Sequence, residues 1–568
     1  MKDQSLFFIR ANQIPLWKIT YFFVVACLFG AAAWNRFSLP QDPLADGDPG
    51  YLWPALMKLS GRPFAHIQGL NFLYPGMIYL ILRICRDFRA ISVIQHLLGL
   101  VAGALFLASW SRLRDFLPKS PVNRITHEAI GIGGVAIYLL SNTPILFEMQ
   151  IRSDSVCMFF EILTFWLIIQ FFRYRVVSPN GRKADVYGAA VAVNAFLLAS
   201  LKPSFTLMAL FSVLPVIYLL LAAKGNLTGK IAFFSIVVPI VAALALVEHH
   251  LRRDDTTAKV YLPETLFVIH ANIIHAQMAA DLQNGVTSMY SSQWLRVACD
   301  DLNAEIQRTH HLTPQKYPVL GFEPEKLRHG SADPLLKRWR HELGDEQFLR
   351  FLKYWYWHSL AKQPLAFVEK IARQIGVFYS LNCPAFSPYK NLPLASWAYA
   401  TSLSTLSRPE WLGLLTTSPA GSDFLERTKR VRFSNVVVHE NRRVQMWNNW
   451  CARSYLAVLL VSVALAVWYL VMRNGSENLT LPAFLVVYFY SANLGNVFGL
   501  SVVHTMEVWR YPAVQFIAAL FAQLWAIRWL IEIGLIKLRA SRQARASDER
   551  GEIPSATLAN LCVAREWH

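Results

Sequence analysis

The sequence predicts an all-α polytopic membrane protein. Its 568 residues are 54% hydrophobic and 13% aromatic, and the mean hydropathy is +0.31. Only 16% of the residues are charged, whereas about 25% are charged in a typical soluble domain. Apolar runs of about 18–22 residues recur along the chain, and each is long enough to cross about 30 Å of hydrocarbon as a helix.

The positive charge of the chain fits a membrane protein better than a nucleic-acid-binding one. The formal net charge is +18 and the pI is about 9.6. Most lysines and arginines lie between the apolar runs, which is the pattern that orients membrane helices. Basic loops beside anionic lipid headgroups account for this charge, so no nucleic-acid partner is expected.

Ten membrane spans are expected, with both termini in the cytoplasm, because Lys and Arg flank the corresponding ends of the spans. The predicted spans are 16–35, 91–110, 125–147, 155–172, 186–201, 204–222, 231–247, 454–472, 481–500 and 509–531. The predicted parts of the chain are an N-terminal transmembrane module (1–247), an extracytoplasmic, mainly helical domain (248–450), C-terminal transmembrane helices (451–535) and a disordered cytoplasmic tail (536–568).

The first outer loop, residues 36–90, carries two acids one residue apart. Asp46 and Asp48 lie among Pro and Gly residues, which favour a loop. The amphipathic segment 51–59 that follows is expected to lie on the membrane surface. A carboxylate held at this interface can act as a base or orient a hydroxyl group beside a lipid-borne substrate. The alternative is a solvated acidic turn.

A second apolar segment of this loop, 72–85, is either a surface helix or a short span. It has only about 14 residues, fewer than a span needs, and a Pro-Gly pair interrupts its start. If it lies on the surface, Arg112 and Arg114 fall in the cytoplasm, as the charge rule requires. The arginines within 83–89 favour a span instead. We predict a surface helix.

Charged side chains gather at the outer ends of the predicted spans. The acids are Asp46, Asp48, Glu148, Asp154 and Glu507, and the bases are Arg152, Lys202 and Arg510. Such residues are costly near hydrocarbon and tend to face a cavity or each other. Bases that hold a phosphate beside an acid that activates a hydroxyl suit a lipid-phosphate substrate. The alternatives are a helix cap at Asp154, a snorkelling Lys202 and local ion pairs.

The region 248–450 carries helical periodicity, for example over 264–282 and 347–379, and is long enough to bury a small core. The seven cysteines of the chain show no spacing typical of a zinc or redox site. Cys299 and Cys383 share this region and are the candidates for a disulfide, although nothing local supports their pairing.

Several of these segments resemble the GT-C superfamily of polytopic glycosyltransferases, especially its protein O-mannosyltransferase and aminoarabinose-transferase branch, which is glycosyltransferase family 39-like. The likeness lies in 46–51 (DGDPGY), 73–79 (LYPGMIY), 147–154 (FEMQIRSD), 201–203 (LKP) and 507–512 (EVWRYP). It covers 1–222 and, less closely, 480–531, and it leaves 248–450 unmatched. The acid-to-aromatic spacing departs from the family pattern, so the base stays open between Asp46 and Asp48.

The resemblance implies a GT-C-like bundle that transfers a hexosyl or pentosyl group, with inversion, from a polyprenyl-phosphate-linked donor. The acceptor would be a lipid, a glycan or a protein on the extracytoplasmic face of a bacterial inner membrane. The first-loop acid, preferably Asp48, would be the general base, and Asp154 would be a second acid. The residues expected to bind substrate are Tyr51, Glu148, Arg152, Lys202, Glu507, Arg510 and Tyr511, with Lys202 and Arg510 on the lipid phosphate.

No cofactor or metal is expected, because the branch that this chain resembles generally works without a divalent ion, although other branches use one. A non-enzymatic protein is the alternative, either a flippase or transporter of lipid-linked sugars or a scaffold that binds a partner through 248–450. Transporters usually contain inverted repeats and helices broken at mid-membrane. Here the charges lie at span ends and no internal repeat is evident, which favours the enzyme.

Overall fold

The computed structural model describes thirteen stretches of the chain, most of them helical. They are residues 16–45, 50–64, 71–117, 120–222, 227–252, 256–286, 290–310, 317–329, 333–386, 391–432, 437–472, 477–506 and 510–548. Within these stretches, nine helices are long and apolar enough to cross a membrane, or ten if one bent pair forms a single span. The predicted class, an all-α polytopic membrane protein, is confirmed.

The helices of the bundle follow the predicted spans closely. Their bounds are α1 Leu16–Phe37, α4 Arg89–Leu113, α5 Arg124–Leu140, α6 Asn142–Met149, α7 Asp154–Phe172, α8 Gly181–Leu201, α9 Thr206–Ala222, α10 Leu227–Arg252, α20 Arg442–Met472, α21 Glu477–Val503 and α22 Phe516–Asp548. The bent pair is α5 and α6, which meet at 47° and together match the predicted span 125–147. Helix α20 begins at Arg442, before the predicted end of the region 248–450, because the helix continues beyond its apolar part.

Short helical turns join several of these helices. They are η1 Arg114–Phe116, η2 Arg173–Val177, η3 Pro203–Phe205, η4 Pro384–Phe386, η5 Leu394–Tyr399 and η6 Ala513–Gln515.

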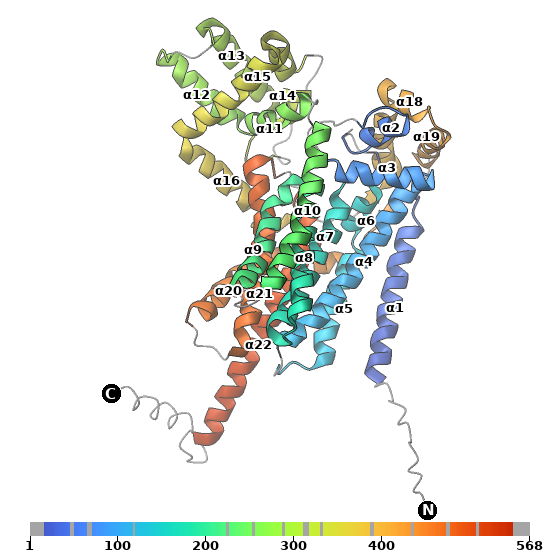
Figure 1. The fold of residues 1–568 in the computed structure, drawn as a ribbon, viewed down its shortest axis with the longest axis vertical. Coiled ribbons are helices and arrows are strands. Elements are labelled where there is room, and N and C mark those ends of the chain that lie inside the picture. Colours follow the sequence, from blue (N-terminus) through green and yellow to red (C-terminus); the bar gives the residue numbers. More distant parts are fainter. Residues whose placement is uncertain are drawn as a thin grey trace, which may run out of the picture.

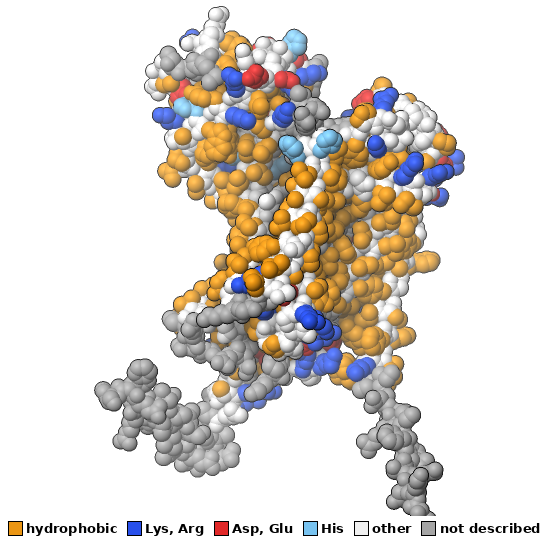
Figure 2. All heavy atoms as spheres, in the orientation of Figure 1, with side chains coloured by type: hydrophobic (Ala, Val, Ile, Leu, Met, Phe, Trp, Pro, Cys, Tyr) orange, Lys and Arg blue, Asp and Glu red, His pale blue; other side chains and the backbone are white. Residues whose placement is uncertain are grey.

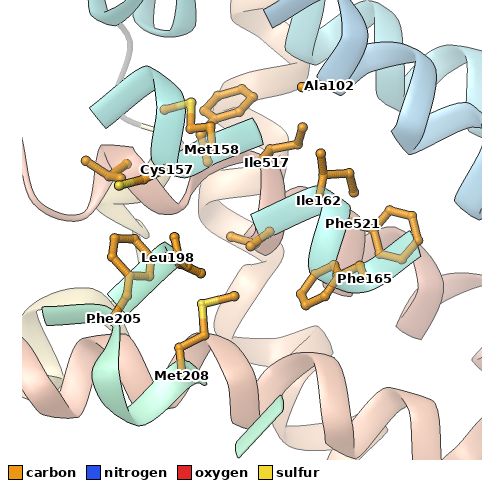
Figure 3. Packing of buried hydrophobic residues seen from close by; sticks show 14 of the residues in the cluster. Ala102, Cys157, Met158, Ile162, Phe165, Leu198, Phe205, Met208, Ile517 and Phe521 are labelled. Carbon is orange, nitrogen blue, oxygen red and sulfur yellow. The ribbon is translucent and has the colours of Figure 1, made fainter. Parts of the chain in front are cut away.

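Helix α7 lies at the centre of the bundle, and its apolar residues are buried on nearly every side. Phe165 packs against Phe489 and Phe521, with ring centroids 4.7 and 5.6 Å apart, and Figure 3 shows Met158 and Ile162 in the same core. A helix that is apolar all round is buried within a bundle. Helices α1 and α10 are the opposite case, since only 6% of the apolar window of each is buried, so they face the surroundings of the bundle.

The first loop forms two short helices at one end of the bundle. They are α2 Trp53–Leu59 and α3 Leu73–Cys85, and α3 runs across the ends of α1 and α4 rather than along them (Figure 1). Helix α3 has 13 residues and ends at Arg86, whose φ of 54° is left-handed and stops the helix. Its length and direction agree with the predicted surface helix.

The region 248–450 forms two separate parts rather than one domain. The first consists of α11 Thr256–Ile269, α12 Ala271–Gln283, α13 Ser292–His310, α14 Glu325–His329, α15 Leu335–Lys362 and α16 Pro364–Phe378. It has its own core around Trp339, Phe351 and Trp355. The second consists of β1 Asn391–Pro393, α17 Ala400–Leu406, α18 Pro409–Leu415, α19 Pro419–Arg432 and β2 Val437–His439; β1 and β2 pair antiparallel. It lies beside α2 and α3 (Figure 1).

The candidate disulfide does not form. Cys299 is a buried free thiol in α13, and Cys383 is a buried free thiol just before η4. Each therefore behaves as a small apolar residue in its own environment.

The two ends of the bundle differ in what covers them. One end carries α2, α3 and α11–α19, and we call it the cap end; the opposite end holds the start of α1 and the end of α22 (Figure 1). Lys and Arg side chains gather below the apolar surface at that opposite end (Figure 2), where η2 follows α7 and where α8 and α10 begin. We call it the basic end.

Candidate functional site

Asp154 begins α7 and forms a buried ion pair with Lys202. The Lys202 Nζ lies 2.5 Å from the Asp154 Oδ1, and the two side chains are 11% and 2% exposed. Lys202 follows the last residue of α8, and the proline after it cannot continue a helix. The backbone of Lys202 is therefore extended, with φ −151°, and this places its side chain at the cap end beside the start of α7.

Residues of the last loop complete this group of charges. The Lys202 Nζ lies 4.9 Å from the centroid of the Tyr511 ring, and the Arg510 guanidinium lies 4.3 Å from the same centroid. Arg510 also donates a hydrogen bond to the Tyr511 hydroxyl, which lies 3.1 Å from the Nε2 of His504. We use the name Asp154 cluster for Asp154, Lys202, His504, Arg510 and Tyr511.

Several positive charges converge on His504 from distant parts of the chain. Burial lowers the pKa of its imidazole to about 3, and the cationic Arg510, Arg328, Lys202 and Lys370 lower it further. Of these, Arg328 lies in α14 and Lys370 in α16, both in the first part of the region 248–450. A neutral imidazole has one N–H donor and one acceptor nitrogen. The Thr505 N–H donates to the His504 Nδ1 at 2.8 Å, so the Nε2 carries the proton and donates to the Tyr511 hydroxyl. The surrounding cations favour an anion at this site.

The first loop is held against the second loop by backbone hydrogen bonds. The Leu44 N–H donates to the Met149 carbonyl at 2.8 Å, and the Ile151 N–H donates to the Leu44 carbonyl at 3.0 Å. Arg152 follows directly and is buried, 7% exposed. The first and second loops therefore meet at Leu44, two residues before Asp46.

Tyr51 follows the two predicted catalytic acids, Asp46 and Asp48, and is fixed by its contact with α3. Its ring packs edge-on against Tyr74 of α3, with centroids 5.4 Å apart. The Tyr74 hydroxyl donates to the Gln95 Oε1 at 3.0 Å, and the Ser155 hydroxyl donates to the same oxygen at 3.1 Å. Burial, then the neighbouring Tyr51 and Asp154, raises the pKa of Tyr74 well above its ordinary value. Tyr51 thus lies close to the start of α7.

Three of the predicted site residues lie outside the described stretches. They are Asp46, Asp48 and Glu507. The described residues on either side of 46–49, Ala45 and Gly50, are both buried. The choice between Asp46 and Asp48 as the base therefore stays open.

Glu148 is not part of the Asp154 cluster, although the sequence grouped the two acids together. Its carboxylate accepts hydrogen bonds from the Arg36 Nε at 2.7 Å and from an Arg36 terminal nitrogen at 2.9 Å. The His96 Nδ1 lies 2.8 Å from the same carboxylate, and the Glu148 side chain is 1% exposed. Because these partners come from α1 and α4, Glu148 joins three helices and is better placed to stabilise the bundle than to bind substrate.

The close approach of Glu148 to α4 depends on a glycine. A Cβ added at Gly99 would lie 2.0 Å from the Glu148 Oε1, whereas one added at Gly133 of α5 would meet nothing within 4 Å. We expect Gly99→Ala to lower the free energy of unfolding by about 1–3 kcal/mol, because the carboxylate must move from its two partners. Thermal unfolding in detergent measures the change, and Gly133→Ala is the control that should not destabilise. Equal stabilities for the two variants would contradict this contact.

The second part of the region 248–450 holds the first loop from the other side. The Arg427 Nε donates to Asp42 at 2.6 Å and a terminal nitrogen donates to Asp87 at 3.1 Å. The Tyr399 hydroxyl donates to the Asp42 carbonyl at 2.6 Å, and the Ala45 N–H donates to the Ser402 hydroxyl at 3.0 Å. We call these contacts the loop clamp.

Two aromatic pairs add apolar contacts to the loop clamp. Trp53 of α2 packs edge-on against Trp411 of α18, with centroids 5.2 Å apart. Phe88 stacks on Phe424 of α19 at 4.5 Å. Stacked and edge-on pairs of this kind contribute about 0.5–1.5 kcal/mol each beyond their burial, so the clamp is both polar and apolar.

We expect Arg427→Gln to loosen the first loop, because it removes charged hydrogen bonds to Asp42 and Asp87 that contribute about 1.5–3 kcal/mol each. The measurement is amide hydrogen exchange over residues 38–45, which should become faster. Arg430→Gln, an exposed arginine of the same helix, is the matched control. Unchanged exchange in Arg427→Gln would show that the clamp does not restrain this loop.

Two buried ionisable residues were not anticipated. Glu161 lies two turns after Asp154 in α7, is fully buried, and neither of its carboxylate oxygens has a hydrogen-bond partner among the described residues. Lys370 of α16 donates to the Ser501 carbonyl at 3.0 Å, and burial lowers its pKa to about 7. Glu161 could have been singled out from the sequence, because it is an acid inside the apolar run 155–172. Nothing in the sequence relates Lys370 to the distant Ser501.

Comparison with protein-family models, with curated proteins and with solved structures gave no match. Among the described residues, no group of three or more His, Cys, Asp or Glu side chains could hold a metal ion.

Proposed function

We propose that this protein is a membrane glycosyltransferase that transfers a sugar from a polyprenyl-phosphate-linked donor to an acceptor hydroxyl at the cap end. The observation that carries the proposal is the Asp154 cluster, in which Asp154, Lys202 and Arg510 come from three distant segments and meet beside the anchored first loop. Buried charges within a membrane protein are rare and tend to mark substrate sites.

The charges of the cluster suit a lipid phosphate. Lys202 and Arg510 are both within 5 Å of one aromatic ring, so a phosphate that approached Tyr511 would meet an ammonium and a guanidinium together. Guanidinium groups bind phosphate through paired hydrogen bonds, and ammonium groups bind it as compact charges. Asp154 orients the Lys202 ammonium between substrates through their ion pair, which is a positioning role.

The proposed reaction is a displacement at the anomeric carbon. A first-loop carboxylate, Asp48 or Asp46, accepts the proton of the acceptor hydroxyl while that oxygen attacks the anomeric carbon. The bond between this carbon and the phosphate oxygen breaks, and polyprenyl phosphate leaves with the electron pair. Lys202 and Arg510 stabilise the charge on the leaving phosphate. The products are the inverted glycoside and polyprenyl phosphate, and the carboxylate returns its proton to water.

The cap end is proposed to face the extracytoplasmic side of a bacterial inner membrane. The basic end carries Arg175, Arg182 and Lys230 around the junctions of α7–α10, and positively charged loops favour the cytoplasm. Both termini would then be cytoplasmic. The acceptor is a lipid, a glycan or a protein, and the two parts of the region 248–450 would shape its site.

A flippase or transporter of lipid-linked sugars is the second candidate, and Glu161 favours it. A buried carboxyl within a span is typical of transport pathways. The Asp154 cluster lies at the end of a span instead, which favours chemistry at the membrane surface.

The experiment that separates these candidates uses the purified full chain in sealed proteoliposomes with radiolabelled polyprenyl-phosphate sugars. Extracts of the cell envelope supply the acceptors. A transferase releases free polyprenyl phosphate and moves the label to a new product. A transporter moves the intact donor across the bilayer and leaves the sugar–phosphate bond uncleaved. If no hexosyl or pentosyl donor gives either of these two outcomes, both proposals are contradicted.

A further inference from the structure

A cavity lies far from the Asp154 cluster, at the basic end between α8 and α10. Its volume is about 1000 Å³. The residues that line it come from η2, from Asn180 just before α8, and from the N-terminal halves of α8 and α10. It is therefore bounded by three segments whose ends meet where Lys and Arg side chains gather (Figure 2).

One end of this cavity is suited to an anion. Arg175 and Arg182 line it, together with the Thr228 hydroxyl. Among the described residues, the Arg175 guanidinium donates one hydrogen bond, to the Leu219 carbonyl at 2.9 Å, and a guanidinium has five N–H donors. Both α8 and α10 begin here, so the positive ends of two helix dipoles add to the two arginines. Asp185 is the one acid in the lining, which leaves a net positive charge.

The other end of the cavity is apolar. Val186 of α8 and Phe233 and Ile236 of α10 line it, and Ala189 and Ala232 leave room between the helices. Helix α10 is almost wholly unburied along its apolar length, so this end of the cavity opens toward the surface that lipid would cover. The cavity thus has a cationic end and an apolar groove, and the groove lies between α8 and α10.

We propose that this cavity binds an anionic phospholipid of the surrounding bilayer. The headgroup phosphate would lie against Arg175 and Arg182, and an acyl chain would follow the groove past Val186 and Phe233. Basic pockets between membrane helices are a known form of site for anionic lipid headgroups. The site is separate from the proposed transferase site, because the Asp154 cluster lies at the cap end of the same helices.

The test measures which lipids the full chain retains. The protein is reconstituted in nanodiscs with equal amounts of phosphatidylglycerol and phosphatidylcholine, and the lipids that stay bound after transfer to detergent are measured by native mass spectrometry. The wild-type protein should retain phosphatidylglycerol preferentially. We expect Arg175→Gln with Arg182→Gln to reduce this preference by about tenfold or more. Ala232→Trp should reduce it as well, because the indole fills the apolar groove without changing the charge.

The control is Arg539→Gln with Arg542→Gln, which removes the same charge from exposed positions of α22 near the basic end. It should keep the preference. Equal loss in the two double variants would reduce the effect to general attraction by the basic end and would overturn the proposal. So would a wild-type protein without any preference, or one that retains added polyprenyl phosphate at this site instead of phosphatidylglycerol. If the arginine variant does not fold, Ala232→Trp alone decides.

Discussion

Asp48→Asn is expected to lower the rate of sugar transfer by about 10²–10⁴-fold, because general-base catalysis by a positioned carboxylate contributes about that much. Asparagine keeps the size of the side chain but cannot accept the proton of the acceptor hydroxyl. Asp46→Asn tests the other candidate, since the two acids flank a single glycine. The measurement is the initial rate of polyprenyl-phosphate release at saturating donor.

The expected pattern separates the base from its neighbour. A large loss of rate in one variant and a small loss in the other identifies the base. Asp300→Asn, an exposed aspartate of α13, is the matched control and should leave the rate unchanged. All variants should reach wild-type levels in the membrane. A rate that stays at the wild-type level in the Asp46→Asn, Asp48→Asn double variant would remove the proposed mechanism.

Glu148→Ala is expected to lower the free energy of unfolding by about 3–5 kcal/mol, which is typical when one partner of a buried ion pair is removed. The substitution leaves the Arg36 guanidinium, 0% exposed, without its carboxylate, and it also removes the partner of His96. The measurement is the midpoint of thermal unfolding in detergent. The loss of the monodisperse peak in size-exclusion chromatography after heating gives this midpoint.

Glu346→Ala is the control for this prediction. Glu346 pairs with Arg350 one turn away in α15, and both side chains are largely exposed, 80% and 66%. An exposed pair of this kind contributes about 0–1 kcal/mol, so the midpoint should move little. If the two variants unfold at the same temperature, Glu148 does not hold α1, α4 and α6 together.

The predicted spans were close to the observed helices because each depends on residues that are neighbours along the chain. The run of apolar residues in 155–172 became α7, and the proline after Lys202 ended α8 where expected. The 13-residue length of α3 was likewise a local property. The apolar period of a segment determines its secondary structure and its length relative to the bilayer, so these features required no tertiary information.

The partners of the charged residues could not be predicted in the same way. The sequence offered Arg152 as the neighbour of Asp154, but Asp154 pairs with Lys202, 48 residues away. Glu148 had no local partner, and its partner Arg36 is 112 residues away. The loop clamp joins Arg427 to Asp42 over 385 residues. Such pairs depend on which helices pack together.

The sequence by itself determined the class of this protein, the positions of its apolar helices and the end of the bundle at which Asp154, Lys202 and Arg510 lie, because hydropathy and charge act on each segment separately. Tertiary structure alone decided that Asp154, Lys202 and Arg510 meet, that Glu148 is enclosed by α1 and α4, and that residues 391–432 hold the first loop. The physical reason is that a buried charge must find a partner, and the partner within reach depends on the packing of helices that are far apart in the chain.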